Sequence, residues 1–130
     1  MILRTARVTY KGPDRVDVSR SSGISAFAPS RGLLNGYKSG DVPWQEYKIR
    51  YIDEMRRSYQ NNRAEWNALL RMPEVTLCCY CRAGDSCHRL LLAHLVIKIC
   101  HRRAINIDYQ LERLGDVSQG EMFNRPEGSE

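Results

Sequence analysis

The sequence predicts an α/β domain with a mostly parallel sheet, and three observations support this. Short runs of β-branched and aromatic residues alternate with longer segments whose apolar residues recur at helical spacing. The 130-residue length and the 42% hydrophobic content suit one domain with one core. A strand, a helix and a strand follow one another over residues 75–109, and such a unit is parallel and right-handed. We therefore expect a compact, three-layer, Rossmann-like domain over residues 1–114, with helices flanking the sheet.

The N-terminal region predicts two strands that pair with each other. Residues 3–10 include Thr5 and Val8, which are residue types that favour strands. Residues 11–14 contain Gly and Pro and predict a turn, and residues 15–19 form a second strand-like run. Because the two runs are so close in sequence, we expect a hairpin or a tight strand pair.

Two cap signals bound the first helix, and a third opens the next one. Ser30 is a favourable N-cap for a helix over residues 31–38, and Gly40 is a favourable stop. Asp41 is the expected N-cap of the second helix, with Pro43 in its first turn.

The second helix carries one aromatic and apolar face, which predicts core packing rather than a ligand cage. This face consists of Trp44, Tyr47, Tyr51, Met55 and Tyr59. A third helix, capped by Asn61 or Asn62, is expected to run through Leu70 and to stop before Pro73.

The second half of the chain predicts a buried strand, an apolar helix and a last strand. Residues 75–80 form the strand, and residues 90–100 form a helix that is apolar on nearly every side and should lie against the sheet. Residues 104–109 are the last strand. Residues 115–130 are polar and are expected to be a disordered tail.

Charge and cysteine usage indicate the kind of partner and the compartment. The net charge is +5, and residues 1–115 hold 19 Lys and Arg against 11 Asp and Glu. A basic body suits a phosphate-bearing small molecule or nucleic acid, although a merely soluble basic surface would have the same composition. No apolar run is long enough to span a membrane, and the N-terminal residues lack a signal-peptide pattern. Crowded cysteines do not suit a secreted disulfide scaffold, so we expect a cytoplasmic protein without a membrane partner.

Residues 77–89 concentrate the chemistry of this chain. They hold four of the five cysteines, one histidine and two arginines. The segment lies between a strand and a helix and contains Gly84. A strand, a short loop and a helix start bring backbone N–H groups together, so the sequence predicts a functional site here.

The first interpretation of this segment is an anion site. Asp85 or Ser86 can cap the helix, whose first-turn N–H groups favour a phosphate or a carboxylate. Arg82 and Arg89 would add paired donors. In α/β folds the ligand lies beyond the carboxyl ends of the strands, which also brings in Asp17 and Ser19 if their strand is parallel. The binding residues of this interpretation are Ser19, Arg82, Gly84 and Ser86.

The second interpretation is a nucleophilic cysteine. A thiol at a helix start beside Arg and His has a lowered pKa, so Cys81 and Cys87 are candidates, with His88 as acid or base. The arrangement resembles the phosphate loop of cysteine phosphatases and rhodaneses, in which an arginine lies six residues after the cysteine. Here Cys87 lies six residues after Cys81, and Arg89 lies eight after it, which argues against a standard phosphatase.

A metal site and plain packing are the remaining interpretations. Cys79, Cys81, Cys87 and His88 are four potential zinc ligands, but the Cys-x-Cys spacing is tight and no second pair follows, so we expect no metal or other cofactor. Cys78 and Cys79 alternate along a strand, so at least one of them should be an inert core thiol.

The segment VTLCCYCRAGDSCHRLLL, residues 75–92, resembles the signature of the small prokaryotic and phage proteins grouped as domain of unknown function 488. The stretches DVS (17–19), FAPS (27–30) and GDVPWQEYKIRYIDEMRRSYQNNRAEW (40–66) resemble one subgroup, which shares the extra Cys81. The resemblance covers residues 7 to about 100 and implies a compact three-layer α/β fold. It carries over Cys87, His88, Arg89 and Asp17 as family positions, and it suggests a phage or bacterial origin.

These observations together predict a nucleotide-directed or nucleic-acid-directed protein with a pocket above the strand ends. We expect Cys87 as thiolate, His88 as proton carrier, Arg89 as anion donor, and Asp17 to orient His88 or to bind a sugar hydroxyl. The reaction would be hydrolysis or transfer. The alternative is a non-enzymatic phage or bacterial factor that binds a host protein or DNA through basic helices, including Arg56 and Arg57.

Overall fold

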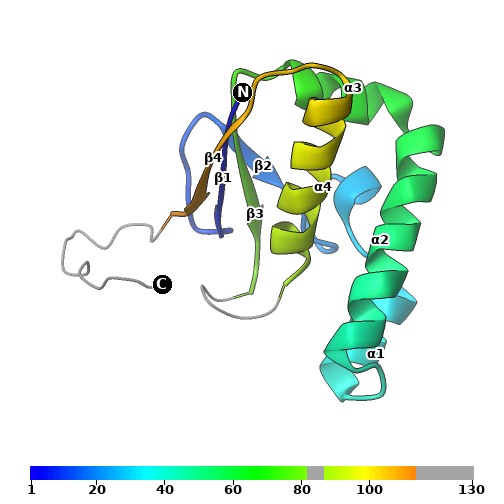
Figure 1. Cartoon of the computed structure of the whole chain (residues 1–130). Coiled ribbons are helices and arrows are strands. Elements are labelled where there is room, and N and C mark those ends of the chain that lie inside the picture. Colours follow the sequence, from blue (N-terminus) through cyan, green and yellow to red (C-terminus); the bar gives the residue numbers. More distant parts are fainter. Residues whose placement is uncertain (82–86, 114–130) are drawn as a thin grey trace.

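The computed structural model describes residues 1–81 and 87–113 and shows a parallel sheet with helices packed beside it (Figure 1). The strands are β1 (Ile2–Arg7), β2 (Arg15–Asp17), β3 (Glu74–Cys79) and β4 (Asp108–Glu112). The helices are the short 3-10 helix η1 (Ser25–Phe27) and the α-helices α1 (Arg31–Ser39), α2 (Trp44–Asn61), α3 (Arg63–Arg71) and α4 (His88–Arg102). The strand order is β2-β3-β1-β4, and every pairing is parallel. The predicted α/β class is confirmed, and the predicted tail over residues 115–130 lies outside the described residues.

The prediction of an N-terminal strand pair is wrong, because β3 lies between β1 and β2. Cys78 of β3 is in register with Ala6 on one side and with Asp17 on the other. After Glu74, every residue of β3 is buried. A strand that is apolar on both faces gains most at the centre of a sheet, so it separates two strands that are neighbours in sequence.

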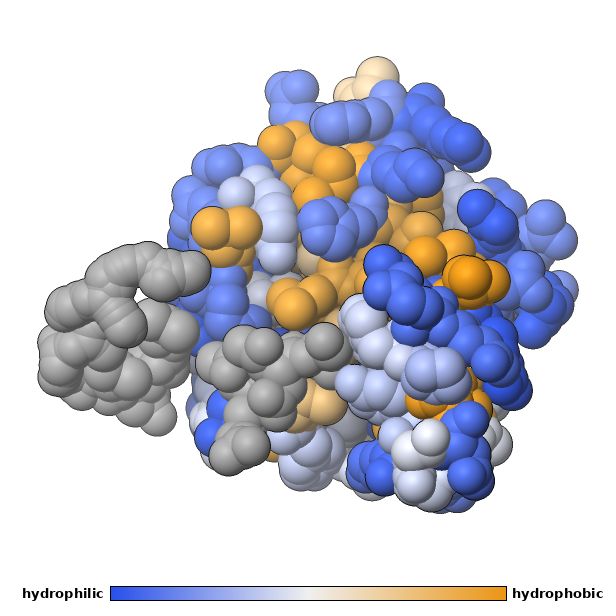
Figure 2. Space-filling model, turned by 60° about the horizontal axis from the view of Figure 1, so that its bottom comes forward, coloured by the Kyte–Doolittle hydropathy of each residue, from blue (hydrophilic) through white to orange (hydrophobic). Residues whose placement is uncertain are grey.

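The helices add two layers beyond the sheet. Helix α4 packs against β1 and β3, and α2 packs against α4, so that the sheet, α4 and α2 follow one another (Figure 1). The predicted apolar face of α2 is confirmed by the buried Tyr47, Tyr51 and Met55. On the face drawn in Figure 2, hydrophobic surface is exposed in the middle and hydrophilic residues surround it. No helix of the described residues is both long and apolar enough to cross a membrane.

The cap signals are mostly confirmed. The Ser30 hydroxyl accepts from the Leu33 N–H at 3.3 Å, and Gly40 ends α1 in the left-handed conformation with φ of 90°. Asp41 is not the N-cap of α2, because Pro43 holds that position with an extended backbone and the helix begins at Trp44. A proline also biases the residue before it toward the extended region, which moves the helix start past Asp41.

The last strand begins four residues later than predicted and contains a bulge. Leu3 of β1 pairs with Tyr109, but Thr5 pairs with Glu112, so β4 advances three residues while β1 advances two. Leu111 has a φ of 68° and is 63% exposed. The extra residue turns Glu112 to the same side as Tyr109, toward α4, where an unbulged strand would place Leu111.

Ser58 joins α2, α3 and η1 through three hydrogen bonds, of which those with Ala26 and Trp66 are buried. Its hydroxyl donates to the Ala26 carbonyl and accepts from the Trp66 indole N–H at 3.0 Å and from the Asn62 amide at 3.1 Å. Trp66 is only 1% exposed, so its N–H has no access to water.

We predict that Ser58→Ala lowers the free energy of unfolding by about 1–3 kcal/mol, because it leaves the buried indole N–H and the Ala26 carbonyl without this partner. Urea denaturation followed by circular dichroism measures the change. The control is Ser39→Ala on exposed α1, which should change stability by less than about 0.5 kcal/mol. Equal effects of the two substitutions would contradict a central role for Ser58.

Candidate active site

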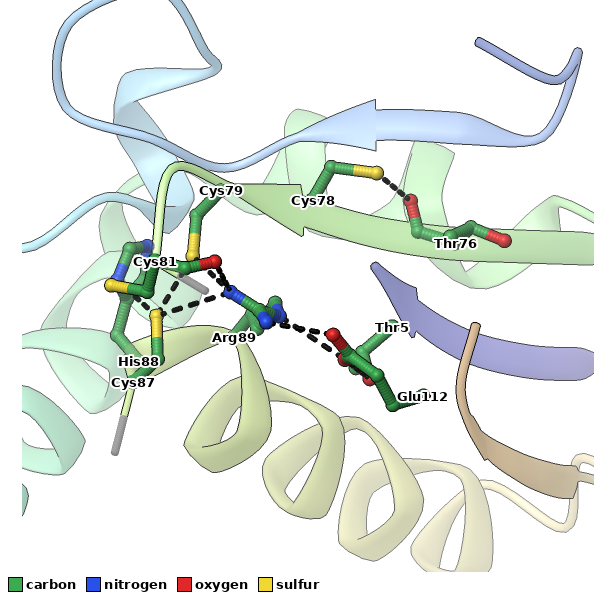
Figure 3. A network of polar contacts seen from close by, with 9 residues as sticks. All are labelled: Thr5, Thr76, Cys78, Cys79, Cys81, Cys87, His88, Arg89 and Glu112. Atoms are coloured by element: carbon green, nitrogen blue, oxygen red, sulfur yellow. Dashed lines mark hydrogen bonds and ion pairs between the residues drawn. The ribbon is translucent and has the colours of Figure 1, made fainter. Parts of the chain in front are cut away.

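Three cysteine sulfurs meet where β3 ends and α4 begins (Figure 3). Cys79 is the last residue of β3, Cys81 follows in the next turn, and Cys87 is the N-cap residue of α4. Their Sγ atoms lie within 4.8 Å of one another, and the Cys79 and Cys87 sulfurs are 2.7 Å apart. Because α4 packs back against β1 and β3, its first residues lie beside the end of β3. Cys87 therefore contacts Cys79, although eight positions separate them in the sequence.

Arg89 connects this cluster to β4. Its guanidinium is buried, and Nη1 donates to the Cys79 sulfur at 3.0 Å and to the Cys81 carbonyl at 2.9 Å. On its other side, Nη2 and Nε donate to the two carboxylate oxygens of Glu112 at 2.7 and 3.2 Å. The Thr5 hydroxyl also donates to Glu112. A buried guanidinium is stable only with such partners, so Arg89 fixes the relative positions of β3, α4 and β4.

Cys79 is the most acidic thiol of the cluster. Hydrogen bonds donated by the Cys81 and Cys87 thiols lower the pKa of Cys79 far below its ordinary value, and the charge of Arg89 adds to this. The same hydrogen bonds keep the donors protonated, so the pKa of Cys87 and that of Cys81 are raised. Among the three coupled thiols, Cys79 is therefore the one that the surrounding hydrogen bonds favour as a thiolate.

Cys78, by contrast, is a core thiol that we predict to be inert. Cys78 and Cys79 are both buried, at 0% and 1% exposed, so the contrast lies in their partners. The Cys78 sulfur, on the opposite face of β3, donates to the Thr76 carbonyl at 3.4 Å. Burial raises its pKa to about 11. The predicted core position of at least one of the two adjacent strand cysteines is confirmed, and the inertness of Cys78 stays a prediction.

His88 adds a proton acceptor beside Cys87. Its Nε2 donates to the Val18 carbonyl at 2.8 Å, which leaves Nδ1 as an acceptor 3.8 Å from the Cys87 sulfur. Burial lowers the pKa of His88 and keeps the ring neutral. The edge of the Tyr51 ring packs against the imidazole. The Val18 carbonyl, and not Asp17 as expected, orients this histidine.

Asp17 belongs to a second polar group, at the end of β2. Its carboxylate accepts from the Ser19 N–H at 2.9 Å and from the Ser22 hydroxyl at 2.6 Å. Ser22 also contacts the Ser19 and Tyr80 hydroxyls, both at 3.1 Å. Tyr80 is 54% exposed, so this group reaches the surface on the strand next to the cysteines.

The predicted site residues are partly brought together. Cys79, Cys81, Cys87, His88 and Arg89 form one cluster, whereas Asp17 and Ser19 lie in the neighbouring group. The remaining predicted binding residues, Arg82, Gly84 and Ser86, lie outside the described residues, as does Asp85.

We expected Cys87, His88 and Arg89 to line an open pocket at the start of α4, and the structure contradicts this. Cys87, His88 and Arg89 are 2%, 5% and 0% exposed, and they point at neighbouring groups rather than at solvent. The guanidinium that was expected to bind a phosphate binds the Cys79 sulfur instead. The pKa of Cys79 is lowered and that of Cys87 is raised, so the geometry favours Cys79 over Cys87 as the thiolate.

Sequence reasoning missed two partners of the cluster. Glu112 lies beyond the predicted last strand and reaches Arg89 only because of the β4 bulge. Val18 contributes a backbone carbonyl, which no side-chain pattern marks. The one available signal is general: a buried arginine requires a carboxylate partner, and few acidic residues are available to supply it.

The same geometry suits a soft metal ion. Three thiolates within 4.8 Å of one another are a ligand set that zinc accepts. The His88 ring is not part of this set, and its Nε2 is bonded to the Val18 carbonyl. The four-residue zinc arrangement considered from the sequence is therefore reduced to three sulfurs.

Comparisons with known proteins place the chain in a family. A family model, DUF488-N3a, described as the active DUF488-N3 subclade, matches residues 2–99. Neither the curated proteins nor the solved structures include a significant match. The matched segment begins with β1 and ends within α4, so it contains the three cysteines, His88 and Arg89. Because this match covers more than half of the chain, the protein belongs to the DUF488 family.

Proposed function

We propose that this domain is a cysteine-dependent hydrolase or transferase that acts on a phosphate-bearing substrate, with Cys79 as the nucleophile. The observation that carries the proposal is the hydrogen bond from Arg89 Nη1 to the Cys79 sulfur at 3.0 Å. Together with the Cys81 and Cys87 thiols, this contact lowers the pKa of Cys79. A thiolate is the reactive form of cysteine, and a site that holds it ionised at neutral pH prepares it for attack.

In the proposed reaction, the Cys79 thiolate attacks the phosphorus of a phosphate ester. A sulfur–phosphorus bond forms as the bond from phosphorus to the leaving oxygen breaks. The leaving oxygen departs from the side of the phosphorus opposite the attacking sulfur and takes its proton from water. Water or an acceptor hydroxyl then attacks the phosphorus, the sulfur–phosphorus bond breaks, and Cys79 leaves again as a thiolate.

His88 carries the proton in the second half of this reaction. Its Nδ1, 3.8 Å from the Cys87 sulfur, accepts the proton of the attacking water or hydroxyl and releases it to bulk water. Its lowered pKa supports this role, because only the neutral ring can accept a proton. The bond from Nε2 to the Val18 carbonyl holds the tautomer in which Nδ1 is free to accept.

Two further observations support a phosphate-bearing, sugar-containing substrate. Lys and Arg exceed Asp and Glu by 19 to 11 over residues 1–115, which favours anionic partners. Asp17, Ser22 and the exposed Tyr80 supply a carboxylate and hydroxyls beside the end of β3, and we assign them to sugar hydroxyls. The description of the matching subclade as active also favours an enzyme over a passive binding module.

We predict that Cys79→Ser lowers turnover of p-nitrophenyl phosphate or bis(p-nitrophenyl) phosphate by about 10³-fold or more, because a serine hydroxyl stays protonated where the thiolate was. Release of p-nitrophenolate is the readout, and mass spectrometry of the quenched reaction should find phosphate on Cys79 of the unsubstituted protein. The matched control is the adjacent Cys78→Ser, which should retain turnover within a few-fold. Full turnover in the Cys79 variant would refute the assignment, as would turnover that depends on Cys87 alone.

The pH profile of kcat/KM should reflect the lowered pKa of Cys79. An ordinary thiol, with a pKa near 8.5, loses about tenfold in thiolate for each pH unit below that value. Since the pKa of Cys79 lies far lower, the thiolate persists as pH falls, and kcat/KM should stay level from about pH 8 to about pH 6. The lowered pKa of His88 keeps its ring neutral over the same range. A tenfold loss per unit beginning near pH 8.5 would contradict an ionised Cys79.

A further inference from the structure

A basic groove lies at the other end of α4, between α2, α3 and α4. Its volume is about 410 Å³, within the range of roughly 300–1,000 Å³ that is usual for small-molecule sites. Its apolar lining comes from Met55, Leu95 and Ile99. Its cationic lining consists of Arg56 of α2, Arg63 of α3, Lys98 and Arg102 of α4, and Arg103, which follows α4.

No carboxylate lines this groove, and none of its five cations forms an ion pair with another described residue. The neighbouring carboxylates of α2 are already engaged, since Asp53 pairs with Arg57 and Glu54 accepts from Ser30. Five like charges around one groove repel one another and destabilise the folded state. A bound anion would remove this repulsion.

Two of the cations are held in place by the aromatic ring of Tyr59. The Arg63 guanidinium lies 4.2 Å from the ring centroid, and its Nε donates to the Tyr59 carbonyl at 2.8 Å. Arg103 donates to the Tyr59 hydroxyl and to Asn67 Oδ1, the latter at 3.1 Å. Guanidinium groups fixed in this way lose little conformational entropy when they bind a phosphate. Arg56, Lys98 and Arg102 are exposed and complete the rim.

Complementarity to the helix dipole does not account for the groove. Cations in the last turn of a helix are stabilised by its C-terminus, which explains Arg102 and Arg103. Arg56 lies inside α2, however, and Arg63 is the first residue of α3, where a positive charge is unfavourable. Their convergence with the end of α4 therefore points to a ligand.

We propose that this groove binds the phosphates and one base of a nucleotide, presented either as a free nucleotide or within a single strand of nucleic acid. The cationic rim suits phosphate oxygens. The apolar lining can pack against a nucleotide base, whereas an inorganic anion would leave this apolar surface uncovered. Helix α4 is 15 residues long, or about 22 Å at 1.5 Å per residue, and separates the groove from the cysteine cluster. The proposal therefore does not depend on the chemistry of Cys79.

The test is a fluorescence-anisotropy titration of the full chain with a labelled single-stranded oligothymidylate. Unlabelled oligothymidylate, ATP and inorganic tripolyphosphate serve as competitors. We expect Arg56→Gln combined with Lys98→Gln to weaken binding of the oligonucleotide by about tenfold or more. The slope of log Kd against log salt should fall by roughly 1 to 2, because two phosphate contacts are lost. Turnover by Cys79 is a separate readout, so the two proposals can fail independently.

The matched control is Arg31→Gln combined with Lys38→Gln on α1, which removes the same charge from an exposed helix that does not line the groove. This control should bind within about twofold of the unsubstituted protein. Competition by ATP as effective as that by the oligonucleotide would identify a free nucleotide as the ligand, and weaker competition would identify a strand. Equal weakening in both double variants, equal competition by tripolyphosphate and ATP, or no binding of any probe would overturn the proposal.

Discussion

The contact that organises this domain is the buried Arg89 guanidinium between the Cys79 sulfur and the Glu112 carboxylate. The buried guanidinium lies between the buried Cys79 sulfur and the partly buried Glu112 carboxylate, so its charge depends on both partners. The arrangement needs the last residue of β3, the first turn of α4 and the bulged end of β4 in fixed positions. The parallel sheet and the packing of α4 on β1 and β3 supply that fixed frame.

The two ends of α4 carry different chemistry. Its N-terminal end contributes Cys87, His88 and Arg89 to a buried cluster in which Cys79 is the most acidic thiol. Its C-terminal end contributes cations to an open groove without a carboxylate. A rigid, largely apolar helix thus separates a reactive sulfur from a positively charged surface. In a family member proposed to act on phosphate-bearing substrates, this separation allows the reaction and the binding of a nucleotide to be altered independently.

Local features of the fold could be predicted from the sequence, and non-local ones could not. Ser30 and Gly40 bound α1 as predicted, because a cap depends on residues within one turn. The order of the strands depends on contacts between residues about 70 apart, and no pattern within residues 1–19 reveals that β3 separates β1 from β2. The bulge at Leu111, which directs Glu112 inward, also has no sequence signal of its own.

The clustering of five of the predicted site residues could be anticipated from composition, but their mutual contacts could not. Cys79, Cys81, Cys87, His88 and Arg89 do come together, because a strand, a loop and a helix start must lie close in space. Which sulfur is ionised depends on which one receives the guanidinium and the two thiol protons. The choice of sulfur depends on whether donor and acceptor atoms lie within hydrogen-bond distance of each other. The local sequence does not determine these distances.

The most direct test of this account is a ¹³C NMR titration of protein labelled at the cysteine Cβ atoms, with Cys79 assigned from the Cys79→Ser spectrum. The Cβ chemical shift distinguishes a thiol from a thiolate at each position. At neutral pH, we predict one thiolate signal, from Cys79, while Cys78, Cys81 and Cys87 remain thiols. A spectrum in which all five cysteines are thiols at neutral pH, or in which Cys87 is the thiolate, would contradict the role assigned to Arg89.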